Sequence, residues 1–402
     1  MAEVTNLTNT SVPEEPGEEE DDDLTLLPLP WLVITLITIC FAIATAVGGN
    51  VLVLLSYCRD RQLRSVHNLY LLHLAVSDLL IGAVSMPLYL IYTVMYWTWP
   101  FGPVVCKIFM VEDFTMCDMS VFVVILVAWD HLAMIRNGAR YSIVETKRKA
   151  YVKLAACWVF SFLLYSPAIV FWDLVRGWSE IPADDCDVEF YAEVNFTVAT
   201  EILSSSVPFL LLMLINTLTF VELRRVRKVA DHAAGEPEHP GHASQEDHRA
   251  STVAHTFSIA RLGTLRELSS HAHSIPVHNV VQTHQHANDR VTVTRVSRRS
   301  RDRRAGMNLV LLVVTLVICW LPYSVTTMMV AECESCVNEY LYEFFNWLLW
   351  IKSCVNPFLY AYNSPRFRKN FLELLSPVIP ARWRVVRTVR GRTITTVLSH
   401  DG

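Results

Sequence analysis

The sequence predicts an all-α membrane protein: a seven-transmembrane-helix bundle with a short amphipathic membrane-surface helix after the seventh span. The prediction rests on two observations. Hydrophobic residues make up 52% of the 402 residues, and they are concentrated in blocks. Each block is long enough to cross a bilayer of roughly 30 Å, and backbone groups in lipid must be satisfied within each helix. The seven blocks lie at 31–57, 68–92, 104–135, 151–172, 193–222, 306–331 and 341–362.

The distribution of charge predicts the orientation. Eight acidic residues lie between positions 14 and 23, and no Lys or Arg precedes the first block. Basic residues cluster in alternate connections and in the C-terminal tail, which by the positive-inside rule places the N-terminus outside and the C-terminus inside. Two glycosylation sequons, at Asn6 and Asn9, fall on the outer side. We therefore expect a multi-pass protein of the plasma membrane with an extracellular, glycosylated N-terminus.

Composition divides the chain into six segments. The first is a disordered, acidic extracellular N-terminus, and the third is a disordered, histidine-rich cytoplasmic loop that separates the fifth and sixth spans. Aromatic and basic residues at helical spacing follow the seventh span and suit a helix lying on the inner leaflet. The basic tail after it is expected either to adhere to anionic lipid or to remain exposed and disordered. The segments are 1–28, 29–228, 229–300, 301–362, 363–375 and 376–402.

The ten cysteines divide by compartment. Cys106, at the outer end of the third span, and Cys186, in the loop before the fifth, both face an oxidising space. Cys333 and Cys336 lie in the short outer loop between the sixth and seventh spans. No second pair lies near them in the sequence to complete a zinc site, so a local disulfide is expected there.

Asp113 is an acid within the third hydrophobic block, two helical turns beyond Cys106. A carboxylate at mid-helix costs about 2.5–3.5 kcal/mol to insert, so one that is retained there meets a partner. A cation arriving from outside the cell is one such partner, and a neighbouring helix is the other. Cys117, one turn deeper on the same face, would line the floor of the resulting pocket.

Several motifs occur in order along the seven blocks. They are Gly48-Gly49-Asn50-Val51, Leu74-Ala75-Val76-Ser77-Asp78, Trp158, Pro208, Cys319-Trp320-Leu321-Pro322-Tyr323 and Asn356-Pro357-Phe358-Leu359-Tyr360. Together they resemble the rhodopsin-like class of G-protein-coupled receptors, over roughly residues 31–375. The resemblance implies a receptor, not an enzyme, that signals through a heterotrimeric G protein.

Within that class the chain is most similar to the aminergic branch, and in particular to the histamine receptors of the third and fourth subtypes. The residues behind this are Asp113, the stretches 162–169 and 179–182, Cys333, Cys336 and the run 342–350. The resemblance implies that Asp113 binds the ammonium group of a small biogenic amine and that coupling is to a Gi-type protein. Trp320, Tyr323 and Trp350 would supply π faces around the cation, with Phe114 beside them. Another amine, or acetylcholine, is the alternative ligand.

The polar end of the pocket departs from the histamine subtypes. They carry a glutamate four residues before the proline of the fifth helix, where this chain has Ser204, and the nearest acid is Glu201, one turn outward. Glu201 taking over the imidazole is one hypothesis. The alternative is a hydrogen-bonding wall of Thr200, Glu201 and Ser204, closer in character to receptors for catechol or indole amines.

The inner end of the third block reads Asp130-His131-Leu132, where the family has Asp-Arg-Tyr. Histidine is shorter than arginine and titrates near neutrality. Asp302, at the inner end of the sixth helix, stands where the family has its lock acid, so a weaker, pH-sensitive pair of His131 and Asp302 is expected. Signalling is then altered, biased or absent; the alternative is that His131 substitutes for arginine with reduced efficiency.

A second departure lies in the seventh block. Asp78 and Ser120 match the sodium-binding residues of the family, but Lys352 replaces the usual asparagine. An ammonium close to Asp78 would neutralise the carboxylate and displace the ion, so agonist binding should be insensitive to sodium. Asp118 is a further unusual acid in the third block, and the sequence does not indicate its partner.

The remaining motif residues predict a conformational switch. Pro322 removes a backbone donor and kinks the sixth helix beside Trp320, which gives a hinge that a ligand can bias through its differential affinity for two states. Asn356 and Tyr360 are expected to form the matching switch on the inner side.

Other functional classes find less support. A retinal-binding photoreceptor needs a lysine in the seventh helix, but Lys352 lies two residues, about 200° of helical rotation, from the position required. A transporter would show internal repeats or broken helices. The sequence carries no catalytic triad, phosphate loop or metal cluster of an enzyme. Membrane lipid is an expected partner, whereas no cofactor and no nucleic acid is. A receptor that binds an amine without signalling is the serious alternative.

Overall fold

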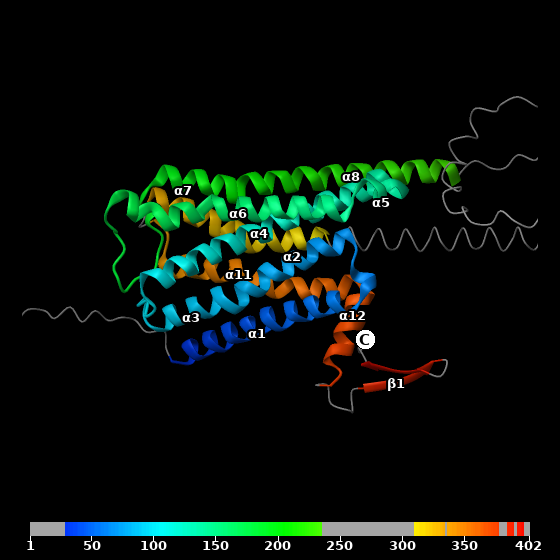
Figure 1. Ribbon diagram of the computed structural model, residues 1–402, viewed down its shortest axis with the longest axis horizontal. Helices are drawn as coiled ribbons and strands as arrows, with labels where there is room; N and C mark the ends of the chain where they lie inside the picture. Colours follow the sequence, from blue (N-terminus) through cyan, green and yellow to red (C-terminus); the bar gives the residue numbers. More distant parts are fainter. Residues whose placement is uncertain (1–28, 235–308, 334–335, 378–383, 390–391, 398–402) are drawn as a thin grey trace, which may run out of the picture. The chain divides into compact units, whose positions relative to one another are not determined.

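The computed structural model describes residues 29–234, 309–333, 336–377, 384–389 and 392–397. Asn6, Asn9, Asp302 and most of the histidine-rich loop lie outside these ranges. Within residues 42–402, the long helical segments that are described run nearly side by side (Figure 1). They are α1 (Leu29–Arg59), α2 (Val66–Leu80) with α3 (Met86–Val94), α4 (Gly102–Asn137), α6 (Lys147–Arg176), α7 (Val194–Glu201) with α8 (Val207–Ala234), the helix Leu309–Glu332, and α11 (Glu339–Asn363).

Six of these segments, among the residues described, are long and apolar enough to cross a membrane. The seventh, α11, is less apolar because it carries polar side chains that turn inward, including Asn346, Lys352 and Asn356, all of them buried. The predicted all-helical membrane bundle is therefore confirmed. The expected span at 341–362 corresponds to α11 within two residues at either end.

Helix α4 forms the centre of the bundle. Its most apolar stretch is 61% buried, more than that of any other described span, and it packs against α2, α6 and α8. A helix surrounded by other helices can carry polar residues on several faces, because each of them meets protein and not lipid. This is why α4 holds Asp113, Asp118 and Asp130, one in each third of its length.

Helices α1 and α11 approach closely at one glycine. A Cβ atom built on Gly49 would lie 2.8 Å from Cγ of Pro357, so only glycine fits there. One residue further, the Asn50 side-chain amide donates to the carbonyl of Ser353 at 3.1 Å and to that of Ala46 at 2.9 Å. The motif that begins at Gly48 thus joins two helices that are about 300 residues apart in sequence.

Two π-helical turns interrupt the spans. One, at Ile81–Ser85, joins α2 to α3, and the other, at Ile202–Ser206, joins α7 to α8. A π-turn inserts one extra residue, and such turns occur frequently at functional sites. The second turn separates Glu201 from Pro208, so it sets the direction in which the polar residues of the fifth span point.

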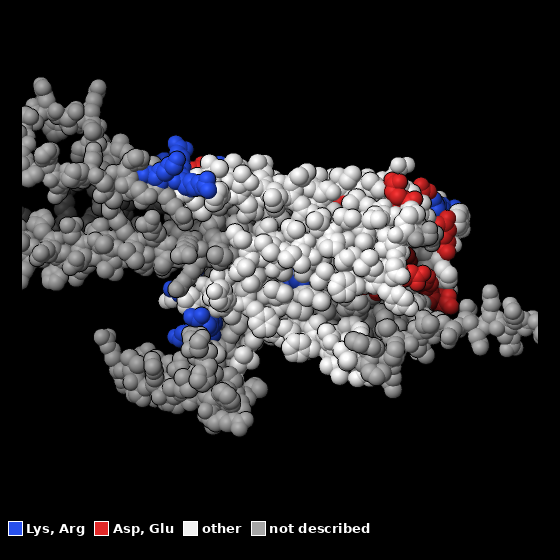
Figure 2. Space-filling model, turned by 180° about the vertical axis from the view of Figure 1, so that it is seen from behind, with Lys and Arg blue, Asp and Glu red and all other residues white. Residues whose placement is uncertain are grey.

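Charged side chains collect at opposite ends of the described part of the chain (Figure 2). The acidic end includes Glu180, Asp184, Asp187 and Glu193, all exposed in the loop between α6 and α7. Exposed basic residues follow the C-terminal ends of α1 and α11 and begin α6. This separation matches the pattern expected for a chain whose basic connections face the cytoplasm.

A short helix, α12 (Pro365–Leu375), follows α11. The Ser364 side chain caps its first turn, and Phe367 and Phe371 lie on its buried face. Beyond it, β1 (Arg384–Val389) and β2 (Arg392–Val397) form an antiparallel hairpin in which Arg384 pairs with Val397 and Val389 with Arg392. The β-branched residues on both sides of Gly391 are the sequence signal for this hairpin, which the prediction of an adherent or disordered tail did not use.

Candidate functional site

Asp113 lies on α4 and is partly buried. Its Oδ1 atom accepts a hydrogen bond from Trp350 Nε1 at 3.0 Å and lies 3.9 Å from the Sγ atom of Cys117. Both of these groups are neutral. The predicted floor residue Cys117 therefore lies beside the carboxylate, and Trp350 meets Asp113 through the N–H of its ring.

Of the three aromatic residues expected around the cation, Trp350 of α11 contacts Asp113, while Trp320 and Tyr323 lie on the sixth span. Trp320 and Trp350 are both almost fully buried. The Tyr323 ring lies 5.7 Å from that of Tyr342, and its hydroxyl lies 3.4 Å from that of Tyr191. These rings form the kind of wall that stabilises an organic cation in a water-poor site.

Phe114 belongs to a different side of the pocket. Its ring lies 4.7 Å from Tyr165 and 6.0 Å from Phe190, centroid to centroid. Phe190 is fully buried in the loop before α7. The predicted site residues therefore fall into two groups, one around Trp350 and one around Tyr165 and Phe190, which Asp113 and Phe114 contact from adjacent positions on α4.

The fifth span supplies three polar residues, and their hydrogen bonds distinguish them. The Thr200 hydroxyl donates to carbonyls of its own helix, and Ser204 accepts from the hydroxyl of Tyr165 at 3.0 Å. Glu201 is 5% exposed, and its Oε2 atom has no hydrogen-bond partner among the described residues. Of the expected hydrogen-bonding wall, only Glu201 keeps an unused charged acceptor.

Two further carboxylates near the outer ends of the helices were not predicted as site residues. Glu112 accepts from Ser85 at 2.9 Å, and Glu343 accepts from Tyr89 at 2.6 Å. The Tyr89 ring in turn lies 5.0 Å from that of Trp350. Glu112 could have been singled out from the sequence because it adjoins Asp113. The contacts of Glu112 and Glu343 could not, because they depend on how α3 and α11 are rotated.

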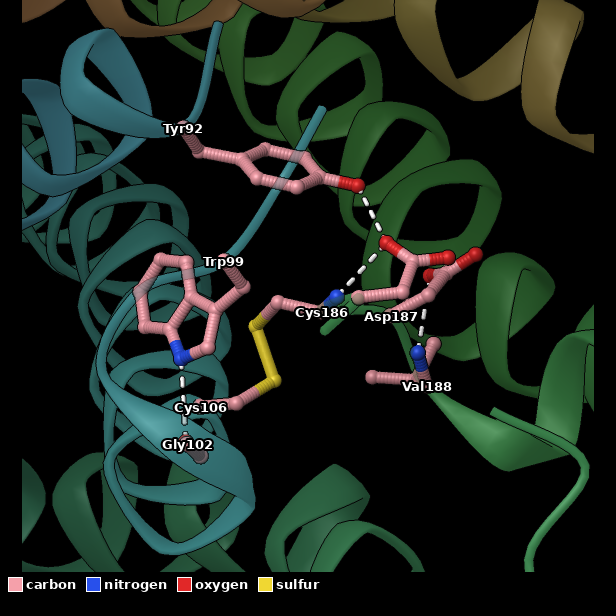
Figure 3. The surroundings of a disulfide bond; sticks show 8 residues. Tyr92, Trp99, Gly102, Cys106, Cys186, Asp187 and Val188 are labelled. Atoms are coloured by element: carbon pink, nitrogen blue, oxygen red, sulfur yellow. Dashed lines mark hydrogen bonds between the residues drawn. A yellow bond between two sulfur atoms is a disulfide. The ribbon is translucent and has the colours of Figure 1, made fainter. Parts of the chain in front are cut away.

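A disulfide between Cys106 and Cys186 fastens the outer loop to the top of α4 (Figure 3). Asp185 accepts hydrogen bonds from the Tyr92 hydroxyl and from the Cys186 backbone N–H. The neighbouring Asp187 accepts from the Val188 backbone N–H at 2.7 Å. The second cysteine pair, Cys333 and Cys336, is also bonded as a disulfide.

Asp187 lies in the loop before α7, next to Cys186 of the disulfide. The residue is exposed on the surface, although neighbouring protein groups crowd its carboxylate. Burial raises the pKa of Asp187 to about 6, while the hydrogen bond from the Val188 N–H acts in the opposite direction. Its charge is therefore present at neutral pH and lost in mildly acidic conditions.

In the middle of the bundle, Asp78 is fully buried and fully bonded. It accepts hydrogen bonds from Ser353 at 2.8 Å and from Asn356 at 2.7 Å. Ser120 donates to a carbonyl of its own helix. Lys352, 3% exposed, places its Nζ atom 5.4 Å from the centre of the Trp320 ring and interacts electrostatically with Asp78.

At the inner end of α4, Asp130 has two partners from other elements. His67 Nδ1 lies 3.1 Å from Asp130 Oδ2, and the Tyr141 hydroxyl donates to Oδ1. His131 is 1% exposed, and neither ring nitrogen has a hydrogen-bond partner within the described ranges. The predicted pair of His131 and Asp302 stays a prediction, because Asp302 lies outside those ranges. The partnership of Asp130 with His67 was not predicted.

The other switch residues lie on the sixth and seventh spans. Pro322 lies within the helix Leu309–Glu332, and its carbonyl accepts from the Thr326 hydroxyl at 3.0 Å. The Asn356 side-chain amide donates a hydrogen bond to Asp78, as described above. Tyr360 is 1% exposed, and its ring lies 6.0 Å from that of Phe367 in α12.

Comparison with known proteins places this arrangement in context. The family described as "7 transmembrane receptor (rhodopsin family)" matches residues 49–360. The chain is similar to the muscarinic acetylcholine receptor M2 of Gallus gallus, at 34% identity over 180 residues, which are 45% of the chain and 38% of that relative. It is 28% identical to the histamine H4 receptor of Mus musculus, over 83% of the chain and 90% of the relative. It is 26% identical to the 5-hydroxytryptamine receptor 1B of Canis lupus familiaris, over 86% of the chain and 87% of the relative.

Proposed function

Because the chain belongs to the rhodopsin family of seven-transmembrane receptors, we propose that it is a cell-surface receptor for a small cationic amine whose ammonium group binds Asp113. Asp113 carries the proposal: it is a partly buried carboxylate whose hydrogen-bonding neighbours, Trp350 and Cys117, are neutral. A charge removed from water gains strongly from a cation at close range. The surrounding rings favour an organic cation over a hydrated metal ion.

The similar receptors support a small amine as the ligand of this chain but do not identify which amine it is. Their names refer to acetylcholine, histamine and 5-hydroxytryptamine, three molecules that share a cationic nitrogen. We favour a histamine-like ligand, because Glu201 keeps a free oxygen that an imidazole N–H could meet. Acetylcholine or another amine is the alternative, and neither needs this second contact.

Radioligand displacement tests the proposal directly. Biogenic amines are compared on the wild type and on Asp113→Asn, which keeps the shape of the side chain and removes its charge. Removing one partner of a buried charge pair costs about 2–5 kcal/mol, so the bound amine should lose at least thirtyfold in affinity. Asp173→Asn, at an outer carboxylate paired with Lys107, serves as the control and should leave affinity unchanged. Equal affinity for the wild type and Asp113→Asn would reject the assignment.

Signalling through a heterotrimeric G protein, of the Gi type by resemblance, is part of the proposal. The N-terminus is proposed to face outward, which the separation of charge in Figure 2 supports. A receptor with weak, biased or absent signalling is the second candidate, and a specific observation favours it. His131 replaces the arginine of the family and is buried, while Asp130 is held by His67 and Tyr141. Nucleotide exchange on a purified G protein, with and without amine, separates the two.

A further inference from the structure

The helix Leu309–Glu332 of the sixth span carries an apolar stripe that the other described helices leave uncovered. The exposed members of this stripe recur at every third or fourth position, which is the spacing of residues on one helix face. In a bilayer such an uncovered apolar face contacts lipid. The members are Val310, Val314, Ile318, Leu321, Val325 and Met329, all between 42% and 58% exposed.

Glu332 continues the stripe and ends the helix, three residues after Met329, and it is exposed. Between positions 309 and 351 the chain contains four glutamates and no Lys, Arg or His. Only one of the four, Glu343, accepts a hydrogen bond from a described tyrosine, Tyr89. The charge at this end of the sixth span is therefore negative, and the group that it attracts is a cation.

A groove is formed by this end of the helix and the disulfide that follows it. Its volume is about 410 Å³, within the roughly 300–1,000 Å³ of small-molecule sites. One of its six lining residues is a carboxylate and the others are apolar, including two methionines, whose flexible side chains adapt to a bound apolar group. The lining residues are Val325, Met328, Met329, Glu332, Cys333 and Cys336.

We propose that this groove binds a single-chain cationic amphiphile from the membrane, a long-chain amine. The ammonium group binds Glu332, and the hydrocarbon chain lies along Met329 and Val325. The seven residues from Val325 to Glu332 rise about 10.5 Å, so the chain runs from the headgroup layer toward the bilayer interior. With the orientation proposed above, the groove opens to the outer leaflet.

The charge of the groove selects this occupant over other lipids. A fatty acid would bring a second negative charge to Glu332, and a zwitterionic phospholipid would bring its phosphate group there. Both are repelled by the carboxylate, and no Lys or Arg of the segment 309–351 offsets the repulsion. The site goes beyond the proposed function because it does not involve Asp113.

Photolabelling with a matched pair of probes tests the groove. Dodecan-1-amine and dodecan-1-ol, each with a diazirine in the alkyl chain, are irradiated with the purified full-length receptor in phosphatidylcholine nanodiscs. Mass spectrometry then measures labelling of residues 325–333 relative to residues 159–163, an exposed apolar segment of α6 that reports the amount of probe in the membrane. We expect the amine to label residues 325–333 at least about threefold more than the alcohol, the range of an exposed ion pair. Unlabelled dodecan-1-amine should displace this labelling.

Three variants locate the bound amine. Glu332→Gln should reduce labelling by the amine to the level of the alcohol. Met329→Trp, which fills the groove with a larger apolar side chain, should reduce labelling by both probes. Glu339→Gln is the control, because Glu339 is an exposed acid at the start of α11 that does not line the groove, and it should preserve the preference for the amine.

Each contrary outcome has a definite meaning. Equal labelling of the wild type by the two probes overturns the site, and so does labelling that unlabelled amine does not displace, since that indicates ordinary boundary lipid. A preference that survives in Glu332→Gln also overturns it. Loss of the labelling in Asp113→Asn would show that the amine reaches the segment only from the Asp113 site, which overturns the groove and leaves the proposed function standing. If a groove variant fails to fold, the preference and the displacement in the wild type decide.

Discussion

The outer and inner halves of the bundle treat their buried acids differently. In the middle of the bundle and at its inner end, both oxygens of Asp78 and both of Asp130 have partners, supplied by Ser353 and Asn356 and by Tyr141 and His67. In the outer half, Asp118 and Glu201 each keep an oxygen without one among the described residues. Asp113 lies between these extremes, since its hydrogen-bond partners Trp350 and Cys117 are neutral while Lys352 interacts with it electrostatically.

This difference distinguishes acids that stabilise the fold from acids that are available to bind a ligand. A buried carboxylate whose oxygens are all bonded contributes to stability, and removing its charge leaves its donors unsatisfied. A buried carboxylate with an unused oxygen costs stability in the empty protein, and a cationic ligand can recover that cost on binding. The pattern of unused oxygens thus supports a ligand site in the outer half.

The largest effect is expected when the same substitution, Asp to Asn, is made at one bonded and at one incompletely bonded acid. Asp130→Asn should lower the free energy of unfolding by about 1.5–3 kcal/mol, because His67 and Tyr141 lose a charged acceptor. Asp118→Asn should leave stability unchanged or raise it, because it removes an uncompensated charge. Thermal melting of the purified empty receptor measures both. Destabilisation of equal size by the two variants would contradict the distinction.

The next test concerns signalling at the inner end. His131→Arg restores the residue type of the family, so amine-stimulated nucleotide exchange should rise roughly fivefold, which corresponds to about 1 kcal/mol. Affinity for the amine in the absence of G protein should stay the same. His131→Gln, which is neutral and of similar size, is the control. If arginine and glutamine give the same exchange rate, the weak or absent signalling has another cause.

A smaller effect is expected at Asp187, in the loop before α7. Because the pKa of Asp187 is raised to about 6, its negative charge disappears as the pH falls through 6, and amine affinity should decrease by about two- to threefold. For stability the sign is the reverse: the raised pKa favours the folded protein below the unfolded pKa of about 4, and this contribution is lost as the pH rises through 6. Affinity measured between pH 5 and pH 7.5 on the wild type and Asp187→Asn should differ in slope. Parallel curves would exclude Asp187 as the titrating group.

The smallest expected effect is the response to sodium. Lys352 already supplies a positive charge that interacts with Asp78, and the oxygens of Asp78 are bonded to Ser353 and Asn356. Agonist affinity in sodium chloride and in potassium chloride should therefore agree within about twofold, since an ion without differential affinity for two states shifts neither. Lys352→Asn should introduce a difference between the salts. A clear sodium effect on the wild type would contradict this prediction.

The helical bundle was predictable because its signal is local. Seven apolar blocks define seven spans, and the polar residues of α11 did not obscure the block at 341–362. The contact of Asp113 with another span also followed, since one acid in an apolar block needs a partner. The neighbourhood of Cys117 and Asp113 followed from four-residue spacing on one helix.

The contacts that the sequence did not predict depend on the rotation and register of separate helices. The π-helical turn at Ile202–Ser206 changes the direction of the residues around it. No residue in the turn is a sequence signal for the extra residue that it inserts. His67 and Asp130 lie 63 residues apart and meet only once α2 and α4 have packed together. The partners of Asp118 depend in the same way on how α7 faces α4.

The disulfide of Cys106 and Cys186 has a practical consequence for handling the purified receptor. The loop that it fastens carries Asp185 and Asp187, on either side of Cys186. Thiol reductants added to protect the free cysteines would release this loop while leaving the helices of the bundle assembled. Preparations purified with and without dithiothreitol should then agree in circular dichroism and disagree in ligand capture, so buffer composition alone can make an intact receptor look inactive.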